Sequence, residues 1–106
     1  IGYQVKIITV KPGGVLSLQK HFKRSEHWVV IAGTPTFTCA DRTLKYTVGE
    51  HVYIGVGDVH RMANYTNIDA KIIEVQVGSY LGEDDIVRIE DIYDRDKNQN
   101  PGTVLQ

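Results

Sequence analysis

Four polar side chains in this chain have types and spacings that suit a metal site. Gln19 and His21 are two residues apart, so on a β-strand they would project from the same face. Glu26 begins the next strand-like stretch, and an antiparallel return of the chain would bring it near His21. His60 opens a later strand-like stretch. This mixed set of amide, carboxylate and imidazole groups suits Zn, Mn, Co, Fe or Ni without selecting one divalent ion.

Each of these residues also has a purely structural interpretation. A single histidine in a β-protein is more often a surface or hydrogen-bonded residue than a metal ligand. Glu26 could form a surface ion pair with Arg24, and Gln19 alone would indicate nothing. The metal-site prediction therefore depends on the spacing of all four residues together.

The elements that must position these side chains are β-strands, because alternating polar and apolar residues and β-branched runs dominate the chain. Short strands at regular spacing predict an all-β sandwich or barrel in a single domain. Residues 35–39 and 43–46 should form a hairpin, and 59–65 should pair with 70–77. A polar loop is expected at 78–85 and a loose polar tail at 96–106. We expect strands at 3–10, 15–21, 26–32, 35–39, 43–46, 51–54, 59–65, 70–77 and 86–89.

Composition narrows the possible partners and compartment. The 106 residues suit one domain, and a net charge of −1 offers no basic surface for nucleic acid. Cys39 is the single cysteine, so a reducing cytoplasm is the expected location. No apolar run reaches the length of a membrane span and no signal peptide opens the chain. The first residue is Ile1 rather than Met, so we expect an upstream segment to be missing.

Two stretches resemble the two motifs of the cupin superfamily. The first motif, an H-x-H pair followed by a glutamate and a glycine, reads here Gln19-Lys20-His21, Glu26 and Gly33, with Gln19 in place of the first histidine. The second reads Gly49, Gly55-Val56-Gly57, His60 and Asn64. The resemblance implies a cupin-type double-stranded β-helix, or jelly-roll barrel, over residues 1–95. It also implies that Gln19, His21, Glu26 and His60 are the metal ligands.

A closer resemblance is to the phosphomannose isomerase domain of the type II family. The matching segments are ITVKPG (8–13), LSLQ (16–19), RSEHWVV (24–30), GDVHR (57–61) and the long run from 73 to 95. The resemblance implies a metal-dependent interconversion of mannose 6-phosphate and fructose 6-phosphate. It also implies a linked nucleotidyltransferase domain, since that family usually forms the C-terminal part of a bifunctional mannose-1-phosphate guanylyltransferase. The family's three successive histidines are here His21, Phe22 and Lys23.

Isomerisation of a sugar phosphate requires a positive group, a phosphate clamp and an acid or base. Arg24, which we expect at the rim of the site, and Arg95 match functional arginines of the family. Arg61, which should point to the opposite face from His60, and Arg88 are alternative clamps. Glu74 is the candidate base, and a metal-bound hydroxide is the alternative. Glu74 and Gln76 would face either a wet barrel interior or solvent, the second being usual for a half-buried strand.

The faces opposite the site predict a second copy of the chain as a partner. If Ser17, Gln19 and His21 point inward, Leu16 and Leu18 point outward. If Glu26 and Trp28 point inward, Val29 and Ile31 point outward. Exposed aliphatic side chains on a sheet indicate that another strand or subunit packs over them, so we expect a homodimer packed through a sheet face.

Two other functions remain open at this point. The chain could be a non-catalytic cupin that binds a sugar or sugar nucleotide, which the replaced histidines favour. It could also be a metal-dependent cupin oxygenase, which an open iron site would allow. Arginines that converge on the metal pocket would favour the isomerase, and a pocket without cationic groups would favour the oxygenase.

Overall fold

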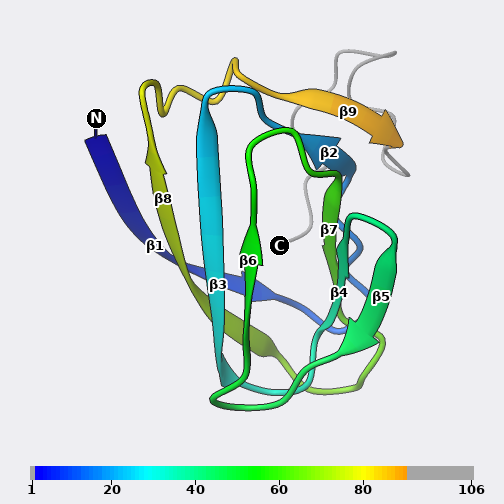
Figure 1. Ribbon diagram of the computed structural model, residues 1–106. Helices are drawn as coiled ribbons and strands as arrows, with labels where there is room; N and C mark the ends of the chain where they lie inside the picture. Colours follow the sequence, from blue (N-terminus) through cyan, green and yellow to red (C-terminus); the bar gives the residue numbers. More distant parts are fainter. Residues whose placement is uncertain (1, 91–106) are drawn as a thin grey trace.

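The computed structural model of the protein describes residues 2–90, and this part of the chain forms two antiparallel β-sheets (Figure 1). The expected all-β architecture is therefore confirmed. Arg95 and the expected tail at 96–106 lie outside the described residues. The strands are β1 (Gly2–Val10), β2 (Leu18–Lys20), β3 (Arg24–Ala32), β4 (Thr36–Cys39), β5 (Arg42–Lys45), β6 (His51–Ile54), β7 (His60–Ala63), β8 (Ala70–Gly78) and β9 (Val87–Glu90).

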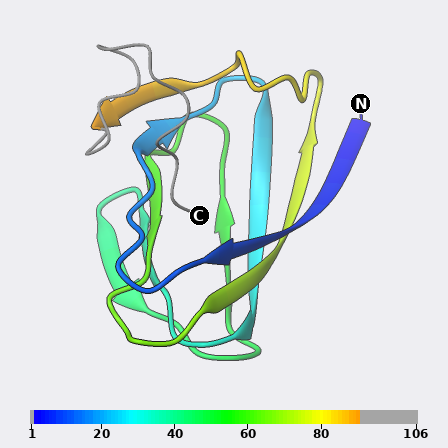
Figure 2. The same cartoon turned by 180° about the vertical axis from the view of Figure 1, so that it is seen from behind.

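The first sheet has the strand order β1-β8-β3-β6, and its three long strands have nine residues each. Glu26 of β3 lies opposite Gln76 of β8, and Trp28 lies opposite Glu74. Because directly opposed residues project from the same face, all four side chains point into the interior. The sequence left open whether Glu74 and Gln76 face the interior or solvent, and the register places both inside. Figure 2 shows β1 and β8 from behind, running side by side.

The second sheet has the order β5-β4-β7-β2-β9. The expected hairpin is confirmed, because β4 pairs with β5 around a turn in which Ala40 has a φ of 55°. Gln19 of β2 lies opposite both His60 of β7 and Arg88 of β9. This register forms a row of three polar side chains that face the first sheet.

Two expected elements differ from the structure. The pairing of 59–65 with 70–77 is wrong, because β7 and β8 belong to different sheets and the connection between them crosses the sandwich. The strand expected at 15–21 is regular only over β2, with Val15 forming an isolated bridge to Ala63. Alternation therefore fails before Leu18, and Leu16 packs against the core instead of pointing outward.

Apolar and polar side chains divide the space between the sheets. Trp28 meets Phe37 edge to face with ring centroids 4.9 Å apart, in the middle of an apolar cluster. Burying each large apolar side chain contributes about 1.5–3 kcal/mol. The cluster comprises Val10, Trp28, Val30, Phe37, Ile54, Met62 and Ile72. Within residues 2–90 there is no helix with the length and apolar character needed to cross a membrane.

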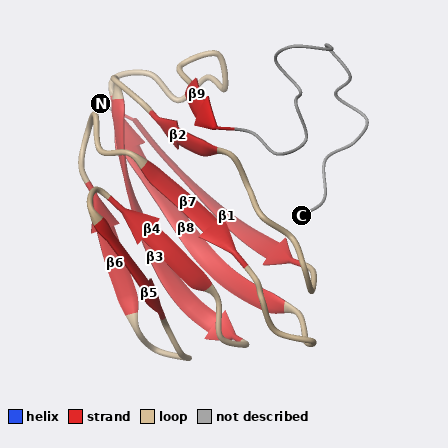
Figure 3. Ribbon diagram, turned by 90° about the vertical axis from the view of Figure 1, so that its right-hand side faces the viewer, coloured by secondary structure: helices blue, strands red, loops and turns tan. Residues whose placement is uncertain are grey.

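The connections before β3 and after β8 meet at one end of the sandwich (Figure 3). The Asp85 carboxylate accepts hydrogen bonds from the backbone N–H groups of Phe22 (3.2 Å) and Lys23 (2.9 Å). Gly78 lies opposite Arg24, and a Cβ at Gly78 would collide with Lys23 O and lie 2.7 Å from Arg24 Cα. Only glycine permits this close approach, which sets the position at which β3 enters the site.

Candidate metal centre

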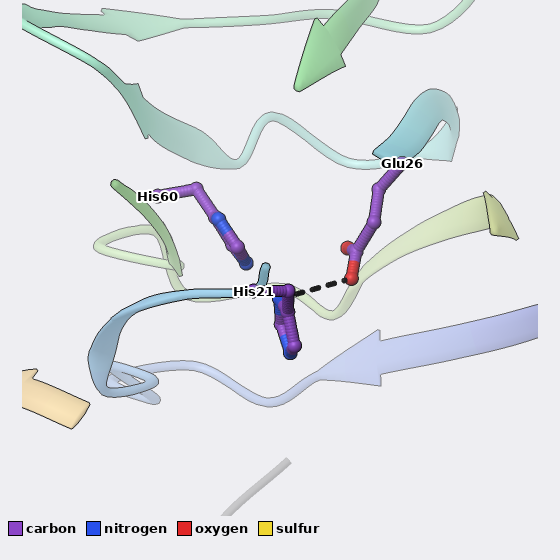
Figure 4. Close-up of side chains that lie close together, drawn as sticks. All are labelled: His21, Glu26 and His60. Carbon is purple, nitrogen blue, oxygen red and sulfur yellow. Dashed lines mark ion pairs between the residues drawn. The ribbon is translucent and has the colours of Figure 1, made fainter. Parts of the chain in front are cut away.

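His21, Glu26 and His60 converge between the two sheets (Figure 4). Their nearest ligand atoms all lie within 4.8 Å of one another, and all three residues are buried. Glu26 comes from the first sheet, whereas His60 begins a strand of the second sheet and His21 directly follows another. Three of the four residues that the sequence proposed as ligands are thus brought together from both halves of the sandwich.

His60 has the orientation of a metal-binding imidazole. Its Nδ1 lies 3.0 Å from the carbonyl oxygen of Asp58, so Nδ1–H donates and Nε2 carries the lone pair. Burial lowers the pKa of His60, which favours the neutral, ligating form. The ring also packs edge to face against Trp28, with centroids 5.6 Å apart.

His21 is held by a neighbouring guanidinium. Arg24 Nη2 donates to His21 Nε2 at 2.9 Å. The other ring nitrogen, Nδ1, is buried without a hydrogen-bond partner and lies 3.5 Å from Glu26 Oε2 (Figure 4). Burial, together with the positive charge of Arg24, lowers the pKa of His21 to about 4. The imidazole is therefore neutral at physiological pH.

Two buried carboxyl groups share one indole. Trp28 Nε1–H donates both to Glu26 Oε1 at 3.0 Å and to Glu74 Oε2 at 3.1 Å. Glu26 Oε2 accepts from Arg24 Nε at 2.9 Å, and Glu74 Oε1 accepts from Gln76 Nε2 at 2.8 Å. Glu26 is thus paired with a fixed cation, whereas Glu74 is bonded only by neutral donors.

These environments move the two carboxyl pKa values in opposite directions. Burial and the neighbouring Glu26 raise the pKa of Glu74 to about 8. Burial alone would raise the pKa of Glu26, but hydrogen bonding from Glu74, the positive charge of Arg24 and the Trp28 N–H hold it below its usual value. At neutral pH Glu26 is therefore a carboxylate and Glu74 keeps a proton.

Arg24 is not at the rim of the site, where the sequence placed it. It begins β3 on the same face as Glu26, and it is only 4% exposed. Its Nη1 reaches outward to Glu83 Oε2 at 3.1 Å, and Lys6 Nζ binds the other oxygen of Glu83 at 2.9 Å. A chain of alternating charges therefore runs from the buried Glu26 to the surface.

A cavity of about 580 Å³ is lined by His21, Glu26 and His60. Gln19 lines it, with its amide nitrogen 3.0 Å from Ser17 Oγ, so its ligand role stays a prediction. Arg88 lines it from β9 beside Gln19, and Lys6 lines the opposite wall. Arg61 borders it, with its Nε donating to Leu16 O at 2.9 Å.

Sequence reasoning did not single out several residues that shape this site. Lys6 lies in the first strand, far from either motif, and nothing in its local pattern connects it to Arg24. Gln76 was noted only as the alternating partner of Glu74. The segment 78–85 was expected only to be a polar loop, and in the structure its Glu83 accepts from Arg24 whereas its Asp85 accepts from the Lys23 backbone N–H.

The residues present fit a divalent ion. Two imidazoles and one carboxylate are ligands that first-row divalent metals accept. His60 presents Nε2 in the required tautomer, and His21 is a buried neutral imidazole whose lone pair is on Nε2. The cluster is therefore consistent with a cupin metal site, with His21, Glu26 and His60 as protein ligands.

Comparisons with known proteins identify the family and agree with the fold. The family described as "Mannose-6-phosphate isomerase C-terminal" matches residues 1–91. The Alginate biosynthesis protein AlgA of Pseudomonas aeruginosa is 57% identical over 93 residues, which are 88% of this chain and 19% of that protein. The Mannose-1-phosphate guanylyltransferase of Salmonella montevideo is 50% identical over 88% of this chain and 20% of its own length.

Among solved structures, a protein from Klebsiella pneumoniae with a double-stranded β-helix domain superposes with a TM-score of 0.73. The match covers 84% of this chain and 76% of that one at 18% identity, so it confirms the expected double-stranded β-helix fold. The chain spans about a fifth of the length of the two curated relatives. On the match over residues 1–91 and the identity to these relatives, this chain belongs to the mannose-6-phosphate isomerase C-terminal family.

Proposed function

We propose that the chain is a metal-dependent aldose–ketose isomerase that interconverts mannose 6-phosphate and fructose 6-phosphate. The observation that carries the proposal is the placement of the His21, Glu26 and His60 cluster and cationic side chains on one cavity of about 580 Å³. That volume is in the usual range for small-molecule sites. A hexose phosphate requires both features, because one end reacts and the other carries charge.

The reaction moves a proton between C1 and C2 through an enediol, so negative charge develops on the two neighbouring oxygens. A divalent ion held by His21, Glu26 and His60, with Gln19 as a further oxygen ligand, would polarise those oxygens as a Lewis acid. Arg24 carries a fixed positive charge beside the same ligands and would stabilise the developing charge.

Glu74 supports the proposal as the group that moves the proton. Its pKa of about 8 lies near neutral pH, where a carboxyl group can both give and take a proton. It lines the cavity within reach of Trp28 and beside Glu26. Gln76 holds one carboxyl oxygen at 2.8 Å and so orients the group.

The phosphate would be held by the cationic residues on the cavity walls. The register places Arg88 in line with Gln19 and His60, and Lys6 lines the cavity from the facing sheet. Arginine presents parallel N–H donors that match phosphate oxygens. Arg95, proposed from the family resemblance, lies outside the described residues and stays a prediction.

A second function, binding of a sugar or sugar nucleotide without catalysis, is favoured by one observation. Phe22 and Lys23, which replace two of the family's histidines, are exposed, and their backbone N–H groups donate to Asp85. The oxygenase alternative is less well supported, because Arg24 contacts two of the three ligands and Arg88 lines the same cavity.

The proposal also covers the domain to which the chain is linked, its location in the cell and its biological role. Because a Mannose-1-phosphate guanylyltransferase is among relatives that extend far beyond this chain, we propose a linked nucleotidyltransferase domain. We also propose a cytoplasmic location and a role in supplying sugar precursors for polysaccharide synthesis, in keeping with the alginate biosynthesis relative.

The test is turnover of mannose 6-phosphate by the metal-stripped chain resupplied with Mn, Co, Zn or Fe. We expect metal-dependent turnover that His60→Ala and Arg24→Ala reduce by about 100-fold or more, because each removes charge stabilisation at the reacting oxygens. His51→Ala is the matched control, since this exposed histidine lies outside the cavity lining. Metal and sugar phosphate binding without turnover would favour the binding function instead.

A further inference from the structure

Arg24 holds the same atoms that a metal ion would use. Its Nη2 donates to His21 Nε2 at 2.9 Å and its Nε donates to Glu26 Oε2 at 2.9 Å. A neutral imidazole has one lone pair, so His21 Nε2 cannot bind a divalent ion and accept from Arg24 at the same time. Glu26 has further carboxylate lone pairs, but Nε and Nη2 belong to one rigid guanidinium, so displacing it from His21 also changes its contact with Glu26.

The third group bonded to Arg24 lies in a different environment. Nη1 donates to Glu83 Oε2 at 3.1 Å, and the Glu83 side chain is 65% exposed whereas that of Glu26 is 2% exposed. Arg24 thus already touches an acceptor on the outer side of the site. A small rotation of the side chain would release the two inner contacts and keep the outer one.

We propose that Arg24 competes with the metal ion for His21 and Glu26, so that the ion must displace the guanidinium from these residues. Glu83 then retains the displaced guanidinium at the cavity wall. The inference rests on the metal site proposed above. It makes metal loading and the release of the Arg24 guanidinium from His21 a single event.

The proposal predicts that a substitution beside the metal ligands raises the affinity for the metal instead of lowering it. Arg24→Gln should bind Co²⁺ more tightly than the unchanged chain, because no buried ion pair has to be broken. We expect the dissociation constant to fall by about tenfold or more, given what removal of a buried charge partner costs. Isothermal titration calorimetry, together with the absorbance of bound Co²⁺, measures this without reference to turnover.

Two matched variants separate competition from simple charge repulsion. Lys6→Met removes another cation of the same cavity, but Lys6 contacts Glu83 and none of the three ligands. Its effect on the Co²⁺ dissociation constant should be less than about threefold by comparison with other partly exposed ion pairs. Arg24→Lys keeps the charge with a single ammonium group, so its affinity for Co²⁺ should lie between those of the unchanged chain and of Arg24→Gln.

Glu83→Gln tests the second half of the proposal. Without the outer carboxylate the displaced guanidinium loses its acceptor, so Co²⁺ should bind less tightly than to the unchanged chain. In the Arg24→Gln background the same change should have little effect, because no guanidinium remains to be retained. An equal loss in both backgrounds would show that Glu83 acts through its charge alone and would overturn this half.

The outcomes distinguish the inference from the proposed function. Co²⁺ binding that is unchanged or weaker in Arg24→Gln would overturn the competition and leave the metal site intact. No Co²⁺ binding by the unchanged chain or any variant would remove the metal site and the inference together. If Arg24→Gln does not fold, as judged by far-ultraviolet circular dichroism, the other two variants still decide. Competition requires Glu83→Gln to bind Co²⁺ less tightly than the unchanged chain and Arg24→Lys to bind it more tightly.

Discussion

Two carboxyl groups of the same type acquire different roles from their hydrogen-bond partners. Glu26 accepts from the Arg24 guanidinium, and Glu74 accepts from the neutral side-chain amide of Gln76. Both accept from the Trp28 indole, which fixes them side by side. The result is one ionised and one protonated group within the same cavity, an arrangement that suits metal binding and proton transfer respectively.

Glu74 should make the metal-free protein less stable as pH rises. Its pKa is about 8 in the folded state and near 4.5 when unfolded, so between these values the folded state binds more protons. The stability contribution is therefore present below pH 4.5 and lost by about pH 8. Glu74→Gln should remove this loss and raise the free energy of unfolding at pH 8.5 on the order of 1–3 kcal/mol.

Urea denaturation followed by circular dichroism at pH 4.5 and 8.5 measures this difference. Glu50→Gln is the control, because Glu50 is an exposed carboxyl that caps Thr47 N and lies outside the cavity. A Glu74→Gln variant with the same stability difference from the parent chain at both pH values would contradict the raised pKa.

His21 should titrate far below an ordinary histidine. Burial and Arg24 lower its pKa to about 4 in the folded state, against 6.5 for an ordinary histidine, so the unfolded state binds more protons between these values. The contribution to stability is complete above pH 6.5 and is lost as pH falls through 4. An NMR titration of the metal-free protein should show this low midpoint, and Arg24→Gln should raise it. A His21 midpoint near 6.5 would exclude the buried, neutral imidazole.

At the scale of elements, the loop between β8 and β9 fixes the end of β2 through a single carboxylate. Asp85 accepts from the backbone N–H groups of Phe22 and Lys23, the residues that join His21 to Arg24. Asp85→Ala should therefore speed amide hydrogen exchange at these two positions by about tenfold, since each loses its acceptor.

Asp84→Ala is the matched control for this exchange measurement. Asp84 is one residue away, and its carboxylate accepts from Tyr80 OH rather than from the β2–β3 connection. Unchanged exchange at Phe22 and Lys23 in Asp85→Ala would mean that the loop does not hold this connection.

Gly78 should be the least replaceable glycine of the first sheet. A Cβ there would lie 2.7 Å from Arg24 Cα, so Gly78→Ala forces β8 away from β3 and should cost on the order of 2 kcal/mol. Gly2 lies directly opposite Gly78 in β1, and its Cβ would meet only Leu81 Cδ1 at 3.7 Å. Gly2→Ala should change the free energy of unfolding by no more than about 0.5 kcal/mol in the same urea titration. Equal effects of the two changes would contradict the close approach.

The local sequence predicted most strands and the convergence of His21, Glu26 and His60, because both depend largely on short-range spacing. The alternation in 24–32 and 70–78 sets which side chains share a face, and the register confirms it for Glu26 and Trp28. It could not predict that 59–65 and 70–77 belong to different sheets, because strand pairing is set by long-range packing. Nor could it place Arg24, whose burial depends on Glu26, His21 and Glu83 together.

At the scale of the whole molecule, the outer face of the first sheet is apolar and without charge over most of its area. Ile7 is 67% exposed and Tyr3 77% exposed on β1, and Val77, Ile31 and Tyr53 continue the surface across β8, β3 and β6. The outward directions predicted for Val29 and Ile31 agree with this face. The predicted homodimer would cover it, since a second identical face brings no charge repulsion.

Light scattering coupled to size-exclusion chromatography tests this prediction. The chain should elute as a dimer, and Ile7→Lys should shift it to a monomer by placing a charge in the contact. Val56→Lys is the control, because Val56 is similarly exposed but lies in the connection between β6 and β7. A monomeric parent chain at concentrations up to about 100 µM would reject the dimer, since a stable interface should hold at that level.

Trp28 is the single tryptophan of the chain, and its indole N–H is shared between the two carboxyl groups of the site. The fluorescence emission of an indole depends on the electric field and polarity around it. Here Trp28 is 2% exposed, and its N–H lies at hydrogen-bond distance from the ionised Glu26 and the protonated Glu74. The protein therefore contains its own fluorescent reporter. A change in the protonation of either carboxyl group, or a ligand that displaces Glu26, should change the wavelength and intensity of the Trp28 emission without an added label.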